Sequence, residues 1–151
     1  MAAHAAVIRP LTENDEAAWR RLWSAYLEFY ETEVSPVIYA TYFKRLLGDD
    51  PQDFNCLLAE VDGRPVGLVH FVFHRHGWKI ENVCYLQDLY AEPEMRGLGV
   101  GRALIEAVYG AADAVGCPSV YWATQHFNHS ARRLYDRVGR LTPFVKYERS
   151  T

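Results

Sequence analysis

The spacing of apolar residues changes repeatedly along the chain, and each change marks a predicted secondary-structure element. Short or alternating apolar runs are typical of β-strands, whereas apolar residues at three- and four-residue intervals indicate the buried face of a helix. Strands are predicted at residues 6–11, 54–61, 65–73, 85–91, 119–124 and 144–147. Helices are predicted at residues 12–30, 36–47, 98–115 and 128–138. The pair Asp62-Gly63 separates two of the strands and favours a tight hairpin.

Nothing in this pattern suggests a division into domains. No internal repeat, linker or low-complexity segment interrupts it. At 151 residues the chain is close to the commonest domain size and long enough to bury one substantial core. Half of its residues are hydrophobic, which excludes a disordered protein. We therefore predict a single domain that spans residues 1–151.

The stretch from residue 85 to residue 108 indicates a strand, a short polar turn, a glycine-rich loop and a helix. The loop, residues 96–101, has the sequence Arg-Gly-Leu-Gly-Val-Gly. Because glycine has no Cβ, the backbone N–H groups of such a loop can converge on a bound anion. The helix that follows directs its N-terminal N–H groups and the positive end of its dipole at the same point. With Arg96 and Arg102 as additional cations, the stretch predicts a pyrophosphate-binding loop.

Three interpretations of this loop compete. A tight turn that binds nothing seldom needs three alternating glycines flanked by two arginines. A dinucleotide-binding Rossmann loop has the pattern G-x-G-x-x-G directly after the first strand, whereas here the pattern is G-x-G-x-G and a polar Glu-Pro-Glu turn intervenes. The third interpretation is a resemblance. The loop matches in full the acetyl-CoA loop of the GNAT family of N-acetyltransferases, Arg/Gln-x-x-Gly-x-Gly/Ala.

The resemblance extends beyond the loop. The sequence Tyr-Trp-Ala-Thr at residues 121–124 is followed by Asn128, Ala131 and Tyr135. Together with Tyr-Leu-Gln-Asp-Leu-Tyr at residues 85–90, this pattern is most similar to the diamine (spermidine/spermine) acetyltransferases and the yeast-type histone/polyamine acetyltransferases. The resemblance implies the GNAT fold of the α/β (α+β) class. That fold has a mixed, mostly antiparallel central sheet of about six to seven strands, flanked by about four helices.

The resemblance also implies which residues hold acetyl-CoA. The loop N–H groups and the two arginines would bind the pyrophosphate. The end of the fourth strand, residues 89–91, would carry a bulge and pair with the pantetheine arm, and one backbone N–H there could stabilise charge developing on the thioester oxygen. The implied cofactor-binding residues are Leu89, Tyr90, Ala91, Arg96, Gly97, Leu98, Gly99, Val100, Gly101, Arg102, Asn128, Ser130, Ala131 and Tyr135.

By the same resemblance, Tyr135 is the catalytic acid that protonates the departing CoA thiolate. It follows Asn128 by seven residues, about two helical turns, so both side chains lie on one helix face. The reference pKa values are about 10 for a phenol and about 8.5 for a thiol, so the transfer needs help from geometry. The alternative role for Tyr135 is that of a core aromatic on an amphipathic helix.

The acceptor side of the site leaves alternatives open. Diamine acetyltransferases carry a glutamate where this chain has Gln87, and an amide cannot act as a base. Asp88 is expected to face the opposite side of the strand. Glu33, Glu81 or His126 could act through water, or the amine arrives neutral or loses its proton to water. The implied substrate-binding residues are Glu28, Glu33 and Gln87, with Tyr26, Phe29 and Tyr30 as aromatic neighbours suited to a cation.

Charge and composition narrow the partners and the location. A formal net charge of −3 argues against a nucleic-acid binder that works by bulk electrostatics. The three cysteines are widely spaced and indicate buried reduced thiols. His70, His74 and His76 are expected at the surface or in a substrate loop, and no metal site is predicted. Without a signal-peptide pattern or a run of membrane-spanning length, we predict a cytoplasmic protein.

The sequence therefore predicts an N-acetyltransferase that transfers the acetyl group of acetyl-CoA to a primary amine by direct attack in a ternary complex. A polyamine- or diamine-like small molecule is the first expectation, and a protein lysine is the second. A non-catalytic acyl-CoA-binding sensor is a further alternative, because Gln87 replaces the base. Relatives of this kind are often homodimers, and the aromatic-rich segment 144–147 is a plausible sheet edge for one.

Overall fold

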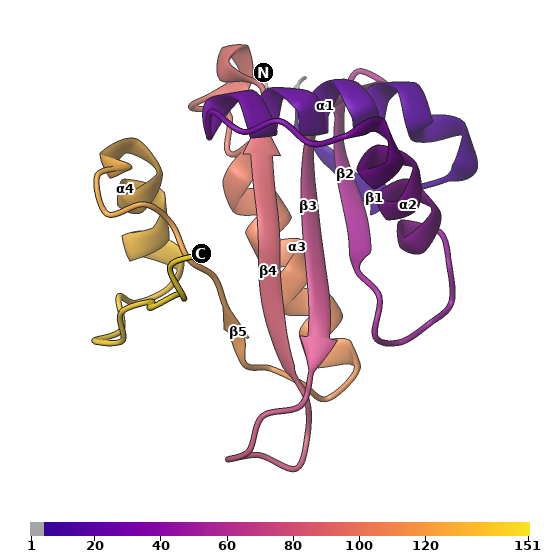
Figure 1. Cartoon of the computed structure of the whole chain (residues 1–151). Helices are drawn as coiled ribbons and strands as arrows, with labels where there is room; N and C mark the ends of the chain where they lie inside the picture. Colours follow the sequence, from indigo (N-terminus) through magenta and orange to yellow (C-terminus); the bar gives the residue numbers. More distant parts are fainter. Residues whose placement is uncertain (1–4) are drawn as a thin grey trace.

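A single sheet with helices on both faces forms the centre of the computed structural model, which describes residues 5–151 (Figure 1). The strands are β1 (Val7–Pro10), β2 (Asn55–Val61), β3 (Arg64–His74), β4 (Val83–Ala91) and β5 (Val120–Tyr121). The helices are α1 (Glu16–Phe29), α2 (Pro36–Leu46), α3 (Val100–Ala114) and α4 (His129–Val138), with short 3₁₀ helices η1 (Glu13–Asp15) and η2 (Pro93–Met95). The expectation that the N-terminus lacks a signal peptide falls largely on residues 1–4, which lie outside the described part.

The strand order confirms the predicted mixed, mostly antiparallel sheet. The order is β1-β2-β3-β4-β5, and only the β4–β5 pair is parallel. Within residues 5–151 the sheet has five strands, fewer than the six to seven expected. The predicted strand at residues 144–147 is wrong, and the one predicted at residues 119–124 shrinks to two residues. Pro143 cannot donate to a ladder, and Phe144 is 78% exposed, so this segment gains neither hydrogen bonds nor burial from the sheet.

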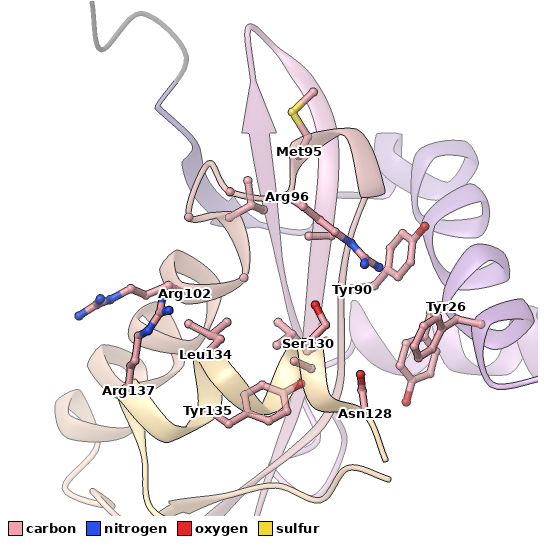
Figure 2. A pocket seen from close by; sticks show the side chains of 18 of the residues that line it. Tyr26, Tyr90, Met95, Arg96, Arg102, Asn128, Ser130, Leu134, Tyr135 and Arg137 are labelled. Atoms are coloured by element: carbon pink, nitrogen blue, oxygen red, sulfur yellow. The ribbon is translucent and has the colours of Figure 1, made fainter. Parts of the chain in front are cut away.

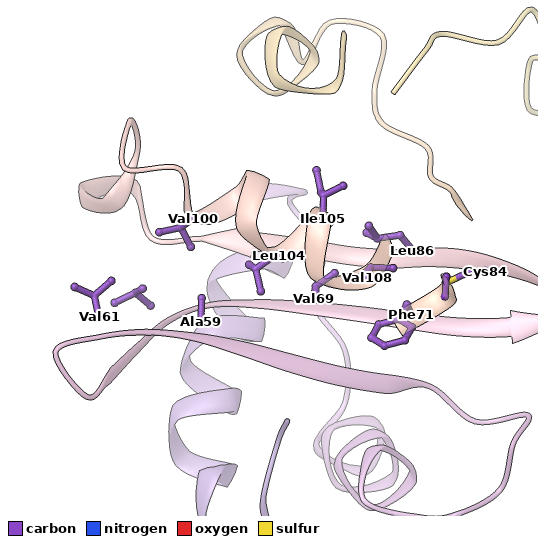
Figure 3. Close-up of a cluster of buried hydrophobic side chains, with 12 residues drawn as sticks. Ala59, Val61, Val69, Phe71, Cys84, Leu86, Val100, Leu104, Ile105 and Val108 are labelled. Carbon is purple, nitrogen blue, oxygen red and sulfur yellow. The ribbon is translucent and has the colours of Figure 1, made fainter. Parts of the chain in front are cut away.

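Two hydrophobic clusters hold the layers together, one on each face of the sheet. Helices α1 and α2 cover one face, where Trp19 and Leu22 are buried against Leu68 of β3. Helix α3 covers the other face and buries Leu104 and Val108 against β3 and β4 (Figure 3). Full burial of one such aliphatic side chain is worth about 1.5–3 kcal/mol. The sheet is therefore covered on both faces between β2 and β4.

Helix α3 begins close to the sheet because β3 has no side chain at Gly67. A Cβ at this position would lie 2.9 Å from the carbonyl oxygen of Tyr90 and 3.1 Å from Cγ1 of Val100. Such contacts would push the first turn of α3 away from the strands. Glycine at this point thus lets the loop before α3 lie directly beside the end of β4.

A buried carboxylate fixes the chain between β4 and α3. Glu92 accepts hydrogen bonds from Arg21 of α1 and from Arg64, whose Nη1 lies 2.8 Å from Glu92 Oε2. The backbone N–H of Glu92 donates to the carbonyl of Val66 at 2.8 Å. Burial works against the charged form, but the two guanidinium groups outweigh it and lower the pKa of Glu92. The ionised carboxylate therefore connects the start of the loop to α1 and β3.

A second ionic contact ties the start of α1 to β1. Arg9 donates from two guanidinium nitrogens to the two oxygens of Asp15, each at 2.8 Å. Thr12 donates its backbone N–H and its hydroxyl to the same carboxylate. The hydrogen bonds from Arg9 are the main reason why the pKa of Asp15 is lowered to about 2.

The variant Asp15→Asn should lower the free energy of unfolding at neutral pH, because it removes the partner of Arg9. The pKa of about 2 in the folded protein lies below the ordinary value of 3.8. The stabilisation is therefore present above about pH 4 and is lost as the pH falls toward 2. Urea unfolding between pH 2 and pH 7 should show a smaller acid-induced loss of stability in Asp15→Asn than in the wild type.

The control for this experiment is Asp53→Asn. Asp53 lies 4.0 Å from the exposed Arg45, and such pairs contribute little. We expect its stability to follow the wild-type pH dependence. Identical pH slopes for Asp15→Asn and the wild type would contradict the role of the Arg9–Asp15 pair.

Candidate functional site

A cavity of about 570 Å³, the first cavity, opens where β4 separates from β5. The two strands pair only at Cys84 and Tyr85 of β4, so the rest of β4 diverges from the chain that follows β5. Residues of α1, the end of β4, the glycine loop, the start of α3 and α4 line the space between them (Figure 2). Segments far apart in the sequence thus meet around one opening.

The glycine loop has the backbone conformation that an anion-binding loop requires. Gly97 and Gly99 have φ angles of 81° and 77°, in the left-handed region that strongly favours glycine. Gly99 is the N-cap of α3, and the first N–H groups of a helix have no partner within the helix. Val100 and Gly101 line the first cavity, so these donors and the positive end of the helix dipole lie at its wall. This arrangement suits a phosphate.

Three arginines border the same opening. Arg96 extends into the cavity toward Tyr90 (Figure 2). Arg102 lines the cavity, but its Nε donates to Glu106 Oε1 at 2.6 Å, so the guanidinium is directed along α3. Arg137 in the last turn of α4 was not predicted, although its spacing of three residues from Leu134 places both on one helix face.

The end of β4 presents a strand edge to the first cavity. Leu89, Tyr90 and Ala91 line it, and they follow the last β4 residue that pairs with β5. Backbone groups on this side of β4 therefore face the cavity instead of a neighbouring strand. An extended ligand could add to such an edge through backbone hydrogen bonds.

Helix α4 contributes a phenol to the first cavity. Asn128, at the N-cap of α4, donates from Nδ2 to the hydroxyl of Thr124 at 3.1 Å. Tyr135 packs edge-on against Trp122, with ring centroids 5.5 Å apart, and Figure 2 shows its hydroxyl directed into the cavity. Burial raises the pKa of Tyr135 to about 12. The phenol is therefore protonated at neutral pH and can act as a proton donor.

The structure brings together nearly all of the predicted cofactor-binding residues. Every one except Leu98 lines the first cavity, and Leu98 is 55% exposed. Of the predicted acceptor-side residues, the aromatic side chains of α1 line this cavity, whereas Glu28 and Glu33 are exposed and lie outside it. The lining residues that sequence reasoning missed are Met95, Leu134 and Arg137.

The expectation that Asp88 faces away from Gln87 is wrong, and a β-bulge is the cause. In the β3–β4 pair Asp88 lies opposite His70, and Leu86 lies opposite Phe71, so Gln87 is an extra residue. The bulge expected at residues 89–91 therefore lies at Gln87. Both Gln87 and Asp88 line a second cavity of about 350 Å³ between α2 and β4. A bulge interrupts strict alternation, which is why neighbouring side chains share one cavity.

The histidines and cysteines among residues 5–151 show no metal-binding arrangement. His70 is fully buried, contrary to its expected place at the surface, because it pairs with Asp88. His74 is exposed, and its Nε2 lies 2.7 Å from the Tyr121 hydroxyl. In the described part of the chain, no three His, Cys, Asp or Glu residues are grouped to hold a metal ion.

Among residues 5–151, no helix is both long and apolar enough to cross a membrane.

Two alanine substitutions should show that the loop requires glycine at its left-handed position, whereas helix α3 does not require glycine in its interior. Gly99→Ala should lower the free energy of unfolding by about 1–2 kcal/mol, because a left-handed residue acquires a Cβ. Gly110→Ala lies within α3 with open space around the added Cβ, so it should raise the free energy of unfolding by about 0.5–1 kcal/mol. Urea unfolding measures both changes. A Gly99→Ala variant as stable as the wild type would show that the loop does not need the left-handed conformation.

Known proteins are similar to this chain in sequence and in fold. The family model described as "Acetyltransferase (GNAT) family" matches residues 16–139. The D-amino-acid N-acetyltransferase HPA3 of Saccharomyces cerevisiae is 38% identical over 145 residues, which cover 95% of this chain and 90% of the yeast protein. Thialysine N-epsilon-acetyltransferase of Bos taurus is 34% identical over 94 residues, covering 57% of this chain and 55% of the bovine protein. The crystal structure of ribosomal-protein-alanine N-acetyltransferase from Brucella melitensis biovar Abortus 2308 has a TM-score of 0.80 at 22% identity, covering 98% of this chain and 100% of its own.

Proposed function

The chain belongs to the acetyltransferase (GNAT) family of acetyl-CoA-dependent enzymes, and from this premise we propose that it acetylates a primary amine of a small molecule. The observation that carries the proposal is the convergence of the glycine loop, the open edge of β4 and Tyr135 on the first cavity. The names of the yeast and bovine relatives refer to D-amino acids and thialysine, which are small amines. We propose a diamine-like acceptor within this class.

The residues around the first cavity fit acetyl-CoA. The N–H groups at the start of α3 and the Arg96 guanidinium would bind its pyrophosphate. The edge of β4 would hold the extended pantetheine arm through backbone hydrogen bonds. A Cβ at Gly101 would lie 3.3 Å from Leu134 Cδ2, so glycine keeps the opening between α3 and α4 clear. Bound acetyl-CoA supplies a thioester carbonyl that a neutral amine can attack.

We assign the acid role to Tyr135. Its hydroxyl is directed into the cavity from α4, and like any phenol it carries its proton at neutral pH. Burial raises its pKa to about 12, so proton transfer to the sulfur depends on close geometry. The phenol would give this proton to the sulfur of the leaving group. Asn128 at the start of the same helix lines the cavity and would orient the arm that carries that sulfur.

The first cavity supports a reaction without a dedicated protein base. Within the described residues, none of the side chains that line it is Asp, Glu or His. Gln87 lines the other cavity and its amide cannot accept a proton at neutral pH. We therefore propose that the amine arrives neutral or loses its proton to water.

The proposed function is tested by thiol release from acetyl-CoA across a panel of amines. The panel contains diamines, polyamines, amino acids and a lysine-containing peptide. Release should occur with at least one small primary amine and should be slower with the peptide. Faster release with the peptide would favour the protein-lysine alternative. Tight binding of CoA with no release on any amine would favour the sensor.

The variant Tyr135→Phe should lower kcat by about 10²–10⁴-fold, the usual range for the loss of a general acid. The dissociation constant for acetyl-CoA, measured by calorimetry, should change little because the ring remains in place. Tyr147→Phe is the matched control, since Tyr147 is 91% exposed and lies outside the cavity. Unchanged turnover in Tyr135→Phe would remove this residue from the acid role.

The cytoplasmic location and the homodimer stay predictions. The exposed apolar side chains of the C-terminal segment, including Phe144 and Val145, favour the homodimer.

A further inference from the structure

Arg137 is a cation of the first cavity that the proposed binding of the pyrophosphate does not use. It lies in the last turn of α4 and lines the cavity. Within residues 5–151 no hydrogen bond or ion pair holds its guanidinium. An arginine in the last turn of a helix also stabilises the helix dipole, which is the alternative explanation for its presence. Its surroundings decide between that structural role and the binding of a ligand.

The end of α4 that carries Arg137 is held firmly against the rest of the domain. The phenol of Tyr109 in α3 donates to the carbonyl of Val138 at 2.7 Å. A Cβ at Gly139 would lie 2.9 Å from the ring of Trp122, so glycine lets the chain leave α4 directly against this side chain. The backbone of Arg137 is therefore fixed relative to α3, although its side chain is exposed.

Arg137 also lies close to the anion-binding start of α3. Leu134 of α4 faces Gly101, where an added Cβ would come within 3.3 Å of its Cδ2. Arg137 follows Leu134 by three residues, so it lies on the same face of α4 and about 4.5 Å further along the helix axis. The wall of the first cavity thus offers a second cationic position, near the N–H groups that suit a pyrophosphate but separate from them.

Arg102 of α3 approaches this second position. Figure 2 shows the side chains of Arg102 and Arg137 at the same end of the cavity, away from Tyr26 and Tyr90. The partner of Arg102 is Glu106, and the two side chains are 55% and 53% exposed. Because an exposed ion pair of this kind contributes little, a doubly charged anion can compete with Glu106 for the guanidinium.

Two guanidinium groups from different helices match a phosphate monoester. Arginine binds phosphate oxygens through paired, charge-assisted hydrogen bonds. CoA carries a pyrophosphate on the 5′ oxygen of its ribose and a phosphate monoester on the 3′ oxygen. Only one sugar ring separates these groups, so a protein that holds the pyrophosphate at the start of α3 can reach the monoester only from a position nearby. The short step from Gly101 to Arg137 meets this requirement.

Building on the proposed placement of acetyl-CoA in the first cavity, we propose that Arg137 binds the 3′-phosphate of the donor and that Arg102 joins it by leaving Glu106. The two arginines make the enzyme selective for thioesters of CoA. Thioesters whose carrier lacks this phosphate, such as those of dephospho-CoA or of phosphopantetheine on a carrier protein, bind more weakly. Glu106 then acts as an internal competitor, because it occupies Arg102 in the free protein.

Calorimetric titrations with CoA and with dephospho-CoA, which differ only in the 3′-phosphate, test this inference. The wild type should bind CoA about tenfold more tightly than dephospho-CoA. Arg137→Gln should weaken the binding of CoA by about tenfold and leave that of dephospho-CoA unchanged. Glu106→Gln should tighten the binding of CoA by about twofold, since it releases Arg102 from a weak pair, and should leave dephospho-CoA unchanged.

The matched control is Arg133→Gln. It removes the same charge from the same helix, at an exposed position outside the first cavity, so it should change the binding of neither compound. Equal affinity of the wild type for CoA and dephospho-CoA would overturn the inference and leave the proposed acetylation intact. An equal loss of affinity for both compounds in Arg137→Gln would also overturn it.

The binding data also separate this inference from the proposed function. The expected selectivity for CoA, with no thiol release on any amine, would support the inference and refute only the proposed reaction. No binding of CoA to the wild type would overturn the inference together with the donor site on which it rests. The comparison of the two compounds on the wild type needs no variant, so it decides even if a substituted chain does not fold.

Discussion

One extra residue in β4 determines which side chains reach which face of the sheet. Before Gln87, Cys84 and Leu86 pack in the cluster beneath α3, and after it Leu89 and Ala91 do so. A strict two-residue alternation from Leu86 would have placed Leu89 on the opposite face. The bulge restores the apolar face for the end of the strand and turns the intervening carboxylate toward α1 and α2. Both cavities depend on this local shift. Gln87 and Asp88, at the bulge, line the second cavity, and the residues that follow, Leu89 to Ala91, line the first.

The parts of the site that sequence reasoning identified are those that local chemistry dictates. The left-handed conformations of Gly97 and Gly99 and the start of α3 follow from a few neighbouring residues. The placement of Asn128 and Tyr135 on one face follows from helical spacing alone. The strands and the helix boundaries were likewise recognisable, because apolar periodicity and caps are read over short windows. The mostly antiparallel sheet was expected only from the family resemblance.

The features that the sequence did not reveal are those that require partners distant in the chain. The burial of His70 depends on Trp19, which lies 51 residues earlier, and on the bulge that brings Asp88 opposite it. Residues 144–147 have a strand-like sequence, but strand formation needs an edge to pair with, and β5 is only two residues long. Leu98 belongs to the recognised loop motif, yet its side chain turns outward. The loop motif therefore predicted where the backbone of a residue lies more reliably than where its side chain points.

Burial also determines how the sulfur chemistry of this chain can be observed. The thiols of Cys56, Cys84 and Cys117 are all buried. Burial raises the pKa of Cys56 beyond the usual range and that of Cys84 to about 12. Because the thiolate is the form that reacts, the folded chain offers little sulfur to alkylating agents or oxidants. Modification of these cysteines would consequently report local opening of the sheet. In an assay that measures the thiol of released CoA, the cysteines of the folded enzyme would add almost no background.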